Sequence, residues 1–169
     1  MKVNVAQVRR TSGESIHFDV VENFSPFELG TESFSFSAPV HVQLQVINTN
    51  KAVLVSGTIE TELKVICGRC LEPFDYPLNL PYQDEWAFPA QATEELLESA
   101  LLLEKDEVDI SQRIFEQLVL ALPMKFVCSE ECQGLCLTCG ANLNQTKCSC
   151  KEEVIDPRFA ALAKWQAND

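Results

Sequence analysis

The chain has 169 residues, of which 46% are hydrophobic, and it carries a formal net charge of −12. This length suits one ordinary domain with an appendage and excludes two large domains. The negative charge disfavours non-specific binding to nucleic acid. The amino terminus lacks the apolar run of a secretory signal, and no segment reaches the ~18 apolar residues of a membrane helix. We therefore expect a cytoplasmic protein, or one of the plastid stroma if it is organellar, with no membrane partner.

The first forty residues predict two or three short strands. Valines recur at short spacing within 3–8, and apolar residues alternate with polar ones within 16–20 and 33–36. A period of two places alternate side chains on one face of a strand. This part of the chain should therefore contribute strands to a sheet.

Residues 40–82 predict three antiparallel strands. Apolar and polar residues alternate within 41–46, 53–67 and 74–82, and polar turn residues occupy 48–51. This is the pattern of strands that bury one face.

Glycine and proline mark special positions in these strands. Gly57 interrupts the alternation of the second strand and predicts a bulge or a bend. Pro77 and Pro81 lack a backbone N–H and place the third strand at an edge of the sheet.

An acidic segment follows the third strand. Residues 84–109 hold nine acids against one base. We interpret this segment as a solvated loop, with a phosphate mimic that holds a basic partner as the alternative. Within it, residues 94–103 predict a helix that has Thr93 as its N-cap and glutamates in its first turn.

The clearest helical pattern covers residues 110–122. Asp109 is a suitable N-cap, and Gln112 three residues later completes a capping-box pattern. Apolar residues at a spacing of three and four form a broad stripe that should pack on the sheet. Pro123 ends the helix.

These elements predict an α+β fold, with an antiparallel β-sheet core packed by one or two helices and a Cys-rich zinc-binding carboxy-terminal region. We place the core domain at 1–125, including the acidic segment, and the Cys-rich zinc-knuckle region with a terminal helix at 126–169. Asp156 followed by Pro157 predicts the start of that terminal helix.

Eight cysteines are the strongest chemical signal in the chain. Six fall within residues 128–150, and two form a separate Cys-x-x-Cys at 67–70. The candidate metal ligands are Cys67, Cys70, Cys128, Cys132, Cys136, Cys139, Cys148 and Cys150. Because thiols stay reduced in the expected compartment, Zn²⁺ bound by four thiolates is favoured over a disulfide framework.

Residues 135–140 are the strongest single metal signal. Cys136 and Cys139 form a tight turn that supplies two thiolates, and Gly140 relieves the strain where the chain turns away.

The other half of this zinc site stays open at the level of sequence. Cys128 with Cys132, Cys148 with Cys150, or one cysteine from each pair would complete four thiolates. Iron–sulfur binding and reduced thiols are the alternatives to zinc.

Cys67 and Cys70 lie between two expected antiparallel strands. This context suits a zinc-knuckle hairpin that meets a carboxy-terminal pair, so that eight cysteines make two sites. It equally suits two reduced thiols in a tight turn. A thioredoxin-type motif needs a helix after a strand, so a redox role is the weaker alternative.

The sequence contains no catalytic constellation. Its two histidines, His17 and His41, fall among polar neighbours in expected strands. There is no phosphate-binding glycine loop and no nucleophile motif. We therefore expect a protein that is not an enzyme and has no small-molecule substrate.

Four motifs, in this order, resemble the YceD family, which was formerly a domain of unknown function. They are CGRCLEPF at 67–74, EQLVLALP at 116–123, CQGLCLTCGANLN at 132–144 and DPRF at 156–159. The resemblance implies a role in accumulation of the large-subunit ribosomal RNA, hence in ribosome assembly. Some members lack the carboxy-terminal cysteines and keep the hairpin pair, which implies that the two cysteine groups need not form one site.

The leading hypothesis is a non-enzymatic ribosome-assembly factor with a structural zinc site. Its partners would be large-subunit ribosomal RNA, a basic ribosomal protein or another assembly factor, and the acidity favours a protein. The bases of the carboxy-terminal half are read as scattered surface charge: Arg113, Lys125, Lys147, Lys151, Arg158 and Lys164. The alternatives are a thiol redox switch or oxidoreductase using Cys67 and Cys70, and an iron–sulfur protein.

Overall fold

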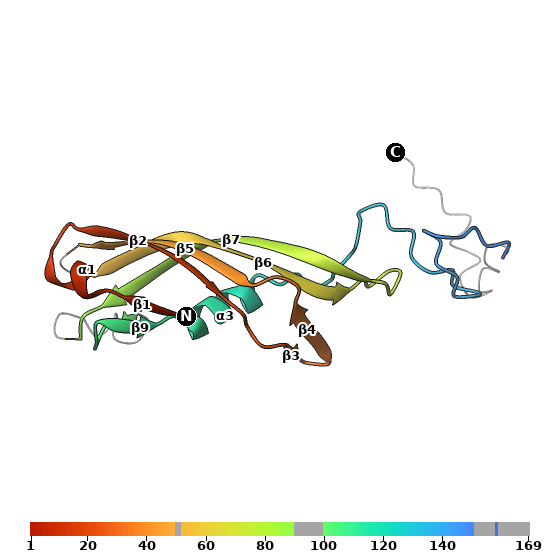
Figure 1. Ribbon diagram of the computed structural model, residues 1–169. Coiled ribbons are helices and arrows are strands. Elements are labelled where there is room, and N and C mark those ends of the chain that lie inside the picture. The colour runs from red at the N-terminus through yellow and green to blue at the C-terminus, as the bar shows by residue number, and fades with distance from the viewer. Residues whose placement is uncertain (50–51, 90–99, 151–157, 159–169) are drawn as a thin grey trace.

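The structure is a computed structural model that describes residues 1–49, 52–89, 100–150 and 158. Figure 1 shows an elongated molecule in which the sheet and helix α3 occupy one part and the cysteine-rich carboxy-terminal segment lies at the other end. Within the described residues, no helix is long and apolar enough to cross a membrane.

Three long strands form the centre of the sheet. They are β5 (Val40–Asn48), β6 (Val53–Ile66) and β7 (Pro73–Ala87). Each pairs antiparallel with the next, and β7 accompanies β6 along its whole length. The predicted strands are confirmed, and β7 runs five residues past the expected end at 82.

Three shorter strands extend the sheet on the β5 side. Strand β2 (Ser15–Glu22) pairs with β5, while β4 (Glu32–Phe36) pairs with β6 beyond the reach of β5. Strand β3 (Phe27–Leu29) pairs with β4. Strands were expected at both 16–20 and 33–36, and these are confirmed.

The amino terminus forms a separate small sheet. Strand β1 (Lys2–Asn4) pairs antiparallel with β9 (Glu107–Asp109). Helix α1 (Ala6–Arg10) follows and buries Val8. The strand expected over 3–8 is therefore only partly correct, because its last residues are helical.

The acidic segment is only partly a loop in its described parts. Its first residues complete β7, β8 (Leu101–Leu102) pairs parallel with the end of β7, and its last residues form β9. The helix predicted for 94–103 is wrong at its carboxy-terminal end, where β8 lies. Its earlier part, and the terminal helix predicted after Pro157, fall outside the described residues.

Helix α3 (Ser111–Leu120) packs on the sheet as the apolar stripe predicts. Ile110, Ile114 and Leu118 are buried in the same apolar cluster as the inner face of the sheet. Phe115 lies edge-on to the ring of Phe27 in β3, with ring centroids 5.0 Å apart. The helix therefore covers one face of the sheet, as Figure 1 shows.

The start of α3 differs from the predicted capping box. The N-cap residue is Ile110, and Asp109 one residue earlier accepts a hydrogen bond from the Ser111 amide at 2.9 Å. Hydrogen bonds from Ser111 hold the pKa of Asp109 below its usual range. The Gln112 side chain does not cap the helix start, because its side-chain amide donates to the Glu116 carboxylate one turn later.

Gly57 lies close to the backbone of the neighbouring strand β5. A Cβ atom at this position would lie 1.9 Å from the carbonyl oxygen of Gln43. The pairing of β5 with β6 continues without a break through Leu44 and Gly57, so the predicted bulge is wrong. Glycine is required here because any side chain would collide with the neighbouring backbone.

Two prolines stand on the outer edge of β7. Pro77 and Pro81 pair with β6 on one side. In the described chain, β7 has a second neighbour only at Trp86 and Ala87. The predicted edge position is confirmed, and the missing N–H groups protect this long edge from pairing with another strand.

Candidate metal centre

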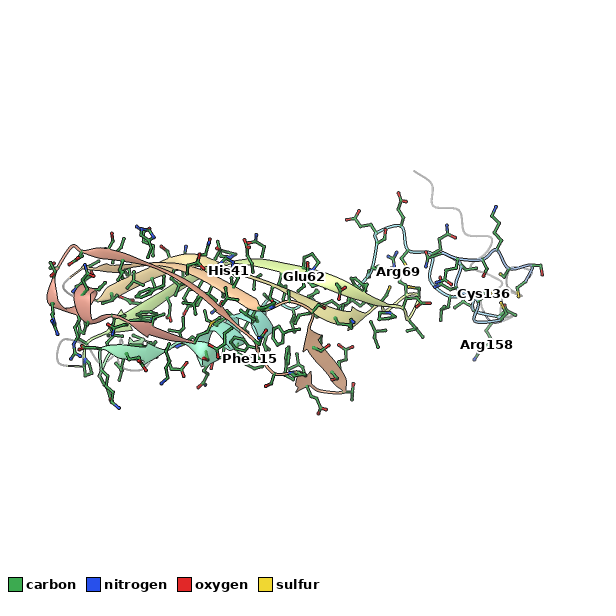
Figure 2. The ribbon with its side chains drawn as sticks, viewed as in Figure 1. His41, Glu62, Arg69, Phe115, Cys136 and Arg158 are labelled. Carbon is green, nitrogen blue, oxygen red and sulfur yellow. The ribbon has the colours of Figure 1, made fainter. Side chains whose placement is uncertain are left out.

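The eight cysteines gather into two groups of four. The first cysteine group is Cys67, Cys70, Cys128 and Cys132, and the second is Cys136, Cys139, Cys148 and Cys150. Within each group, the four sulfur atoms lie within 4.8 Å of one another. The first group includes the tip of the β6–β7 hairpin, where Arg69 is labelled, and the second includes the labelled Cys136, farther from the sheet (Figure 2). Each group could hold one metal ion.

The sulfur separations in the first cysteine group fit a tetrahedral ion. Cys67 and Cys132 have their sulfurs 3.9 Å apart, and Cys70 and Cys128 have theirs 3.7 Å apart. Four thiolates at ~2.3 Å from Zn²⁺ would stand ~3.8 Å apart at the corners of a tetrahedron. A disulfide would need ~2.05 Å, and all eight cysteines are free.

The hairpin tip has the backbone geometry of a metal knuckle. The Leu71 amide donates to the Cys67 carbonyl, and the Cys67 amide donates to the Glu72 carbonyl, each at 2.9 Å. The Arg69 amide points at the Cys67 sulfur at 3.4 Å. The turn therefore directs Cys67 and Cys70 to the same side.

The second knuckle repeats this geometry. The Gly140 amide donates to the Cys136 carbonyl at 2.9 Å, and the Cys136 amide donates to the Ala141 carbonyl at 2.8 Å. The residue after the second cysteine is left-handed in both turns, with φ of 73° at Gly140 and 60° at Leu71. The strong sequence signal at Cys136 and the weaker one at Cys67 thus describe the same turn.

Leu71 is the strained member of this pair of turns. It is a non-glycine residue at positive φ and is 62% exposed, so little packing compensates the strain. The left-handed conformation costs a leucine ~1–2 kcal/mol, whereas glycine adopts it freely.

Replacing Leu71 by glycine should therefore stabilise the metal-loaded protein. We expect a gain of about 0.5–1 kcal/mol, since the relieved strain exceeds the ~0.5–1 kcal/mol that glycine adds to the entropy of the unfolded chain. Thermal unfolding measures it. Leu71→Ala keeps the strained φ and should bring no gain. An equal gain from both variants would show that loss of the exposed side chain, and not the backbone, is responsible.

The thiols of the first cysteine group differ in acidity. Burial opposes ionisation of Cys67, but the backbone amides of Cys128, Cys70 and Arg69 outweigh it and lower its pKa to about 6. Cys128 is exposed when the residue is taken as a whole, but its sulfur atom lies close to the other three sulfur atoms of the group. Desolvation there and hydrogen bonds to Cys67 and Cys132 raise its pKa to about 12.

The second cysteine group shows the same division. Backbone amides of Cys139 and Thr138 lower the pKa of Cys136 to about 6. A hydrogen bond with Cys139 and, to a smaller extent, desolvation raise the pKa of Cys150 to about 12. In each group a cysteine with a lowered pKa lies close to one with a raised pKa. A bound cation would displace the thiol protons and offset the repulsion between neighbouring thiolates.

The first cysteine group is joined directly to the core. The Gly68 amide donates to the Phe126 carbonyl at 2.8 Å, and the ring of Phe126 packs edge-on against Tyr76 of β7. Arg69 donates to the carbonyls of Glu130 and Cys132 at 2.9 and 3.1 Å. The segment that carries Cys128 and Cys132 is thereby held against the hairpin.

The structure selects one of the alternatives that the spacing leaves open. Cys128 and Cys132 join the hairpin pair, and Cys148 and Cys150 join Cys136 and Cys139. The sequence signal for this division was the Cys67–Cys70 hairpin. A knuckle supplies only two of four ligands, so the hairpin needed a second pair of cysteines. Cys70 is followed by strand β7 and not by a helix, so a thioredoxin-type motif is not formed.

Comparisons with known proteins agree with these features. A family model described as "Large ribosomal RNA subunit accumulation protein YceD" matches residues 55–165. An uncharacterized protein of Mycobacterium tuberculosis is 31% identical over 169 residues, covering 97% of this chain and 80% of that protein. The uncharacterized protein YlbN of Bacillus subtilis is 25% identical over 171 residues, covering 100% of this chain and 98% of that protein.

A plant relative carries a functional name. The chloroplastic "Large ribosomal RNA subunit accumulation protein YCED homolog 1" of Arabidopsis thaliana is 27% identical over 152 residues. The match covers 73% of this chain and 47% of that protein. No solved structure matches the chain. The family model spans well over half of the chain, including all eight cysteines, and the chain therefore belongs to the YceD family.

Proposed function

We propose that this protein is a non-enzymatic factor that promotes accumulation of large-subunit ribosomal RNA during ribosome assembly. The family match over residues 55–165 carries this proposal, and the name of the Arabidopsis relative supports it. The site of action would be the cytoplasm, or the plastid stroma for an organellar protein.

Each cysteine group would bind one Zn²⁺ in a structural role. The support is the set of four sulfur atoms in each group, with separations that suit one tetrahedral ion. When bound, the zinc would cross-link chain segments, and a four-thiolate set leaves no open position for a substrate or for water. The knuckle amides would then stabilise the thiolates, while Arg69 would hold the segment that ends at Cys132.

A basic protein is the partner that the charge favours. The chain carries a net charge of −12, and Glu60, Glu62 and Asp75 are exposed on the outer face of β6 and β7. A phosphate backbone would be repelled by this surface, whereas a basic ribosomal protein or assembly factor would be attracted to it. Tight, salt-sensitive binding of the isolated protein to ribosomal RNA fragments would contradict a protein partner.

Depleting the protein in the organism that encodes it tests the function. Large-subunit ribosomal RNA should fall relative to small-subunit RNA, and the wild-type gene should restore the ratio. Cys67→Ser with Cys70→Ser should fail to restore it if the first cysteine group is needed. Gln83→Ala, at an exposed position of β7, is the matched control. An unchanged ratio after depletion would refute the proposed function.

A further inference from the structure

We propose that the two metal sites are coupled through Asn144. This residue belongs to the loop that the second cysteine group closes, and it positions Cys132 of the first. The inference rests on the proposed binding of one Zn²⁺ by each group. It adds that the first site keeps its metal more firmly when the second is filled.

Asn144 contacts a ligand of the other site directly. Its side-chain Nδ2 donates to the Cys132 sulfur at 3.3 Å, and its Oδ1 accepts from the Gln133 amide at 2.8 Å. Asn142 fixes the orientation of the amide group, because its own Oδ1 accepts from Asn144 Nδ2 at 2.9 Å. Asn144 thus binds both the sulfur of Cys132, the last cysteine of the first group, and the backbone of the next residue.

Other residues of the same loop attach to the first site. The Leu143 amide donates to the Gly134 carbonyl at 2.9 Å. Asn142 and Gln145 donate side-chain hydrogen bonds to one oxygen of Glu72, at 3.3 and 3.4 Å. Glu72 ends the knuckle turn of the hairpin, so the loop touches both segments that supply the first cysteine group.

The order of this loop depends on the second cysteine group. The loop runs from Gly140 to Lys147, between Cys139 and Cys148, and residues 144–147 are exposed. Its own support is a hairpin contact between Leu135 and Asn142 and a few backbone hydrogen bonds. A metal ion bound by the cysteines on either side would fix both ends of the loop and hold Asn144 in place.

A hydrogen bond to a ligand sulfur stabilises the thiolate that binds the metal. Losing such an outer contact commonly costs about 10–100-fold in metal affinity. Removing the Asn144 donor and emptying the second site should therefore have the same effect on the first site. The two changes should not multiply, because among these loop contacts it is the one from Asn144 that reaches a ligand sulfur.

The test is a cycle of variants followed at each cysteine. Zinc-loaded protein is mixed with excess chelator and an alkylating reagent, and peptide mass spectrometry measures the alkylation rate of each cysteine. The variants are Asn144→Ala, Asn144→Asp, the pair Cys148→Ser and Cys150→Ser, and the pair combined with Asn144→Ala. Asn144→Asp keeps the acceptor for the Gln133 amide, replaces the donor to sulfur with a carboxylate oxygen, and adds a negative charge beside Cys132.

We expect the cysteines of the first group to be alkylated about tenfold faster in all four variants, with no further gain in the combined one. Asn79→Ala removes an exposed amide bound to Glu60 in the sheet and should leave the rate unchanged. Wild-type rates in the cysteine pair or in Asn144→Asp would overturn the coupling, as would effects that multiply. A wild-type protein that binds no zinc would overturn the metal proposal and this inference together. Two zinc ions with independent release would overturn the coupling alone.

Discussion

Removing the proposed zinc should unfold the cysteine-rich carboxy-terminal region and leave the sheet folded. From residue 127 to 150 the buried residues are Cys132 and Gly134, so this segment has almost no apolar core of its own. The sheet, by contrast, buries a large apolar cluster whose members extend from Met1 to Phe126. Structural zinc contributes about 10–16 kcal/mol to the folding of small metal-bound units, and no other interaction in this segment approaches that value.

Hydrogen exchange measured peptide by peptide with and without chelator would follow this loss. Amides of 127–150 should lose protection, while β5 and the central part of β6 should keep it. Cys128→Ser with Cys132→Ser removes ligands of the first cysteine group alone and should cost protection around these two residues. Ser149→Ala is the control, because it changes an exposed residue between two cysteines of the second group. A region that stays protected after the metal is gone would mean that the hydrogen bonds around Arg69 and Asn144 suffice to fold it.

Gly57→Ala is expected to destabilise the sheet strongly. The new Cβ would lie 1.9 Å from the Gln43 carbonyl oxygen and 2.9 Å from its carbon, and both are backbone atoms that no rotamer change can move. The strands β5 and β6 would have to separate in the middle of the core. Overpacking commonly costs ~1–3 kcal/mol, and a backbone collision belongs at or above the upper end of that range.

Urea unfolding, followed by the fluorescence of the buried Trp86, measures this cost. Gly68→Ala is a matched control, because a Cβ there meets its nearest neighbour, the Phe126 carbonyl oxygen, at 3.5 Å. The control should change the free energy of unfolding by less than about 1 kcal/mol. A small loss for Gly57→Ala as well would show that the strands can slide apart locally.

The strands of the sheet could be predicted because their residues report directly on burial. In β6, a buried residue follows an exposed one at nearly every step, and that period is visible in the sequence. The edge position of β7 was readable for the same local reason, since Pro77 and Pro81 cannot donate on that side. Each of these properties depends on a residue and its immediate neighbours.

What could not be predicted depends on partners distant in sequence. The two residues of β8 are a strand only because they lie beside the end of β7, and β9 is one because β1 lies beside it. The division of the cysteines has the same cause. Cys132 and Cys136 are close along the chain but belong to different groups, because the hairpin brings Cys67 to the first of them. Spacing alone does not contain that contact.

The unbroken pairing of β6 with β7 also sets a length. Fourteen residues of β6 at ~3.3 Å each span ~46 Å. They run from Val53, which pairs with the buried Trp86, to the first cysteine knuckle. This paired stretch, which β5 and β4 also join on the other side of β6, acts as a spacer between the helix-covered face and the cysteine-bearing tip. A partner that engages both ends must itself extend over that distance.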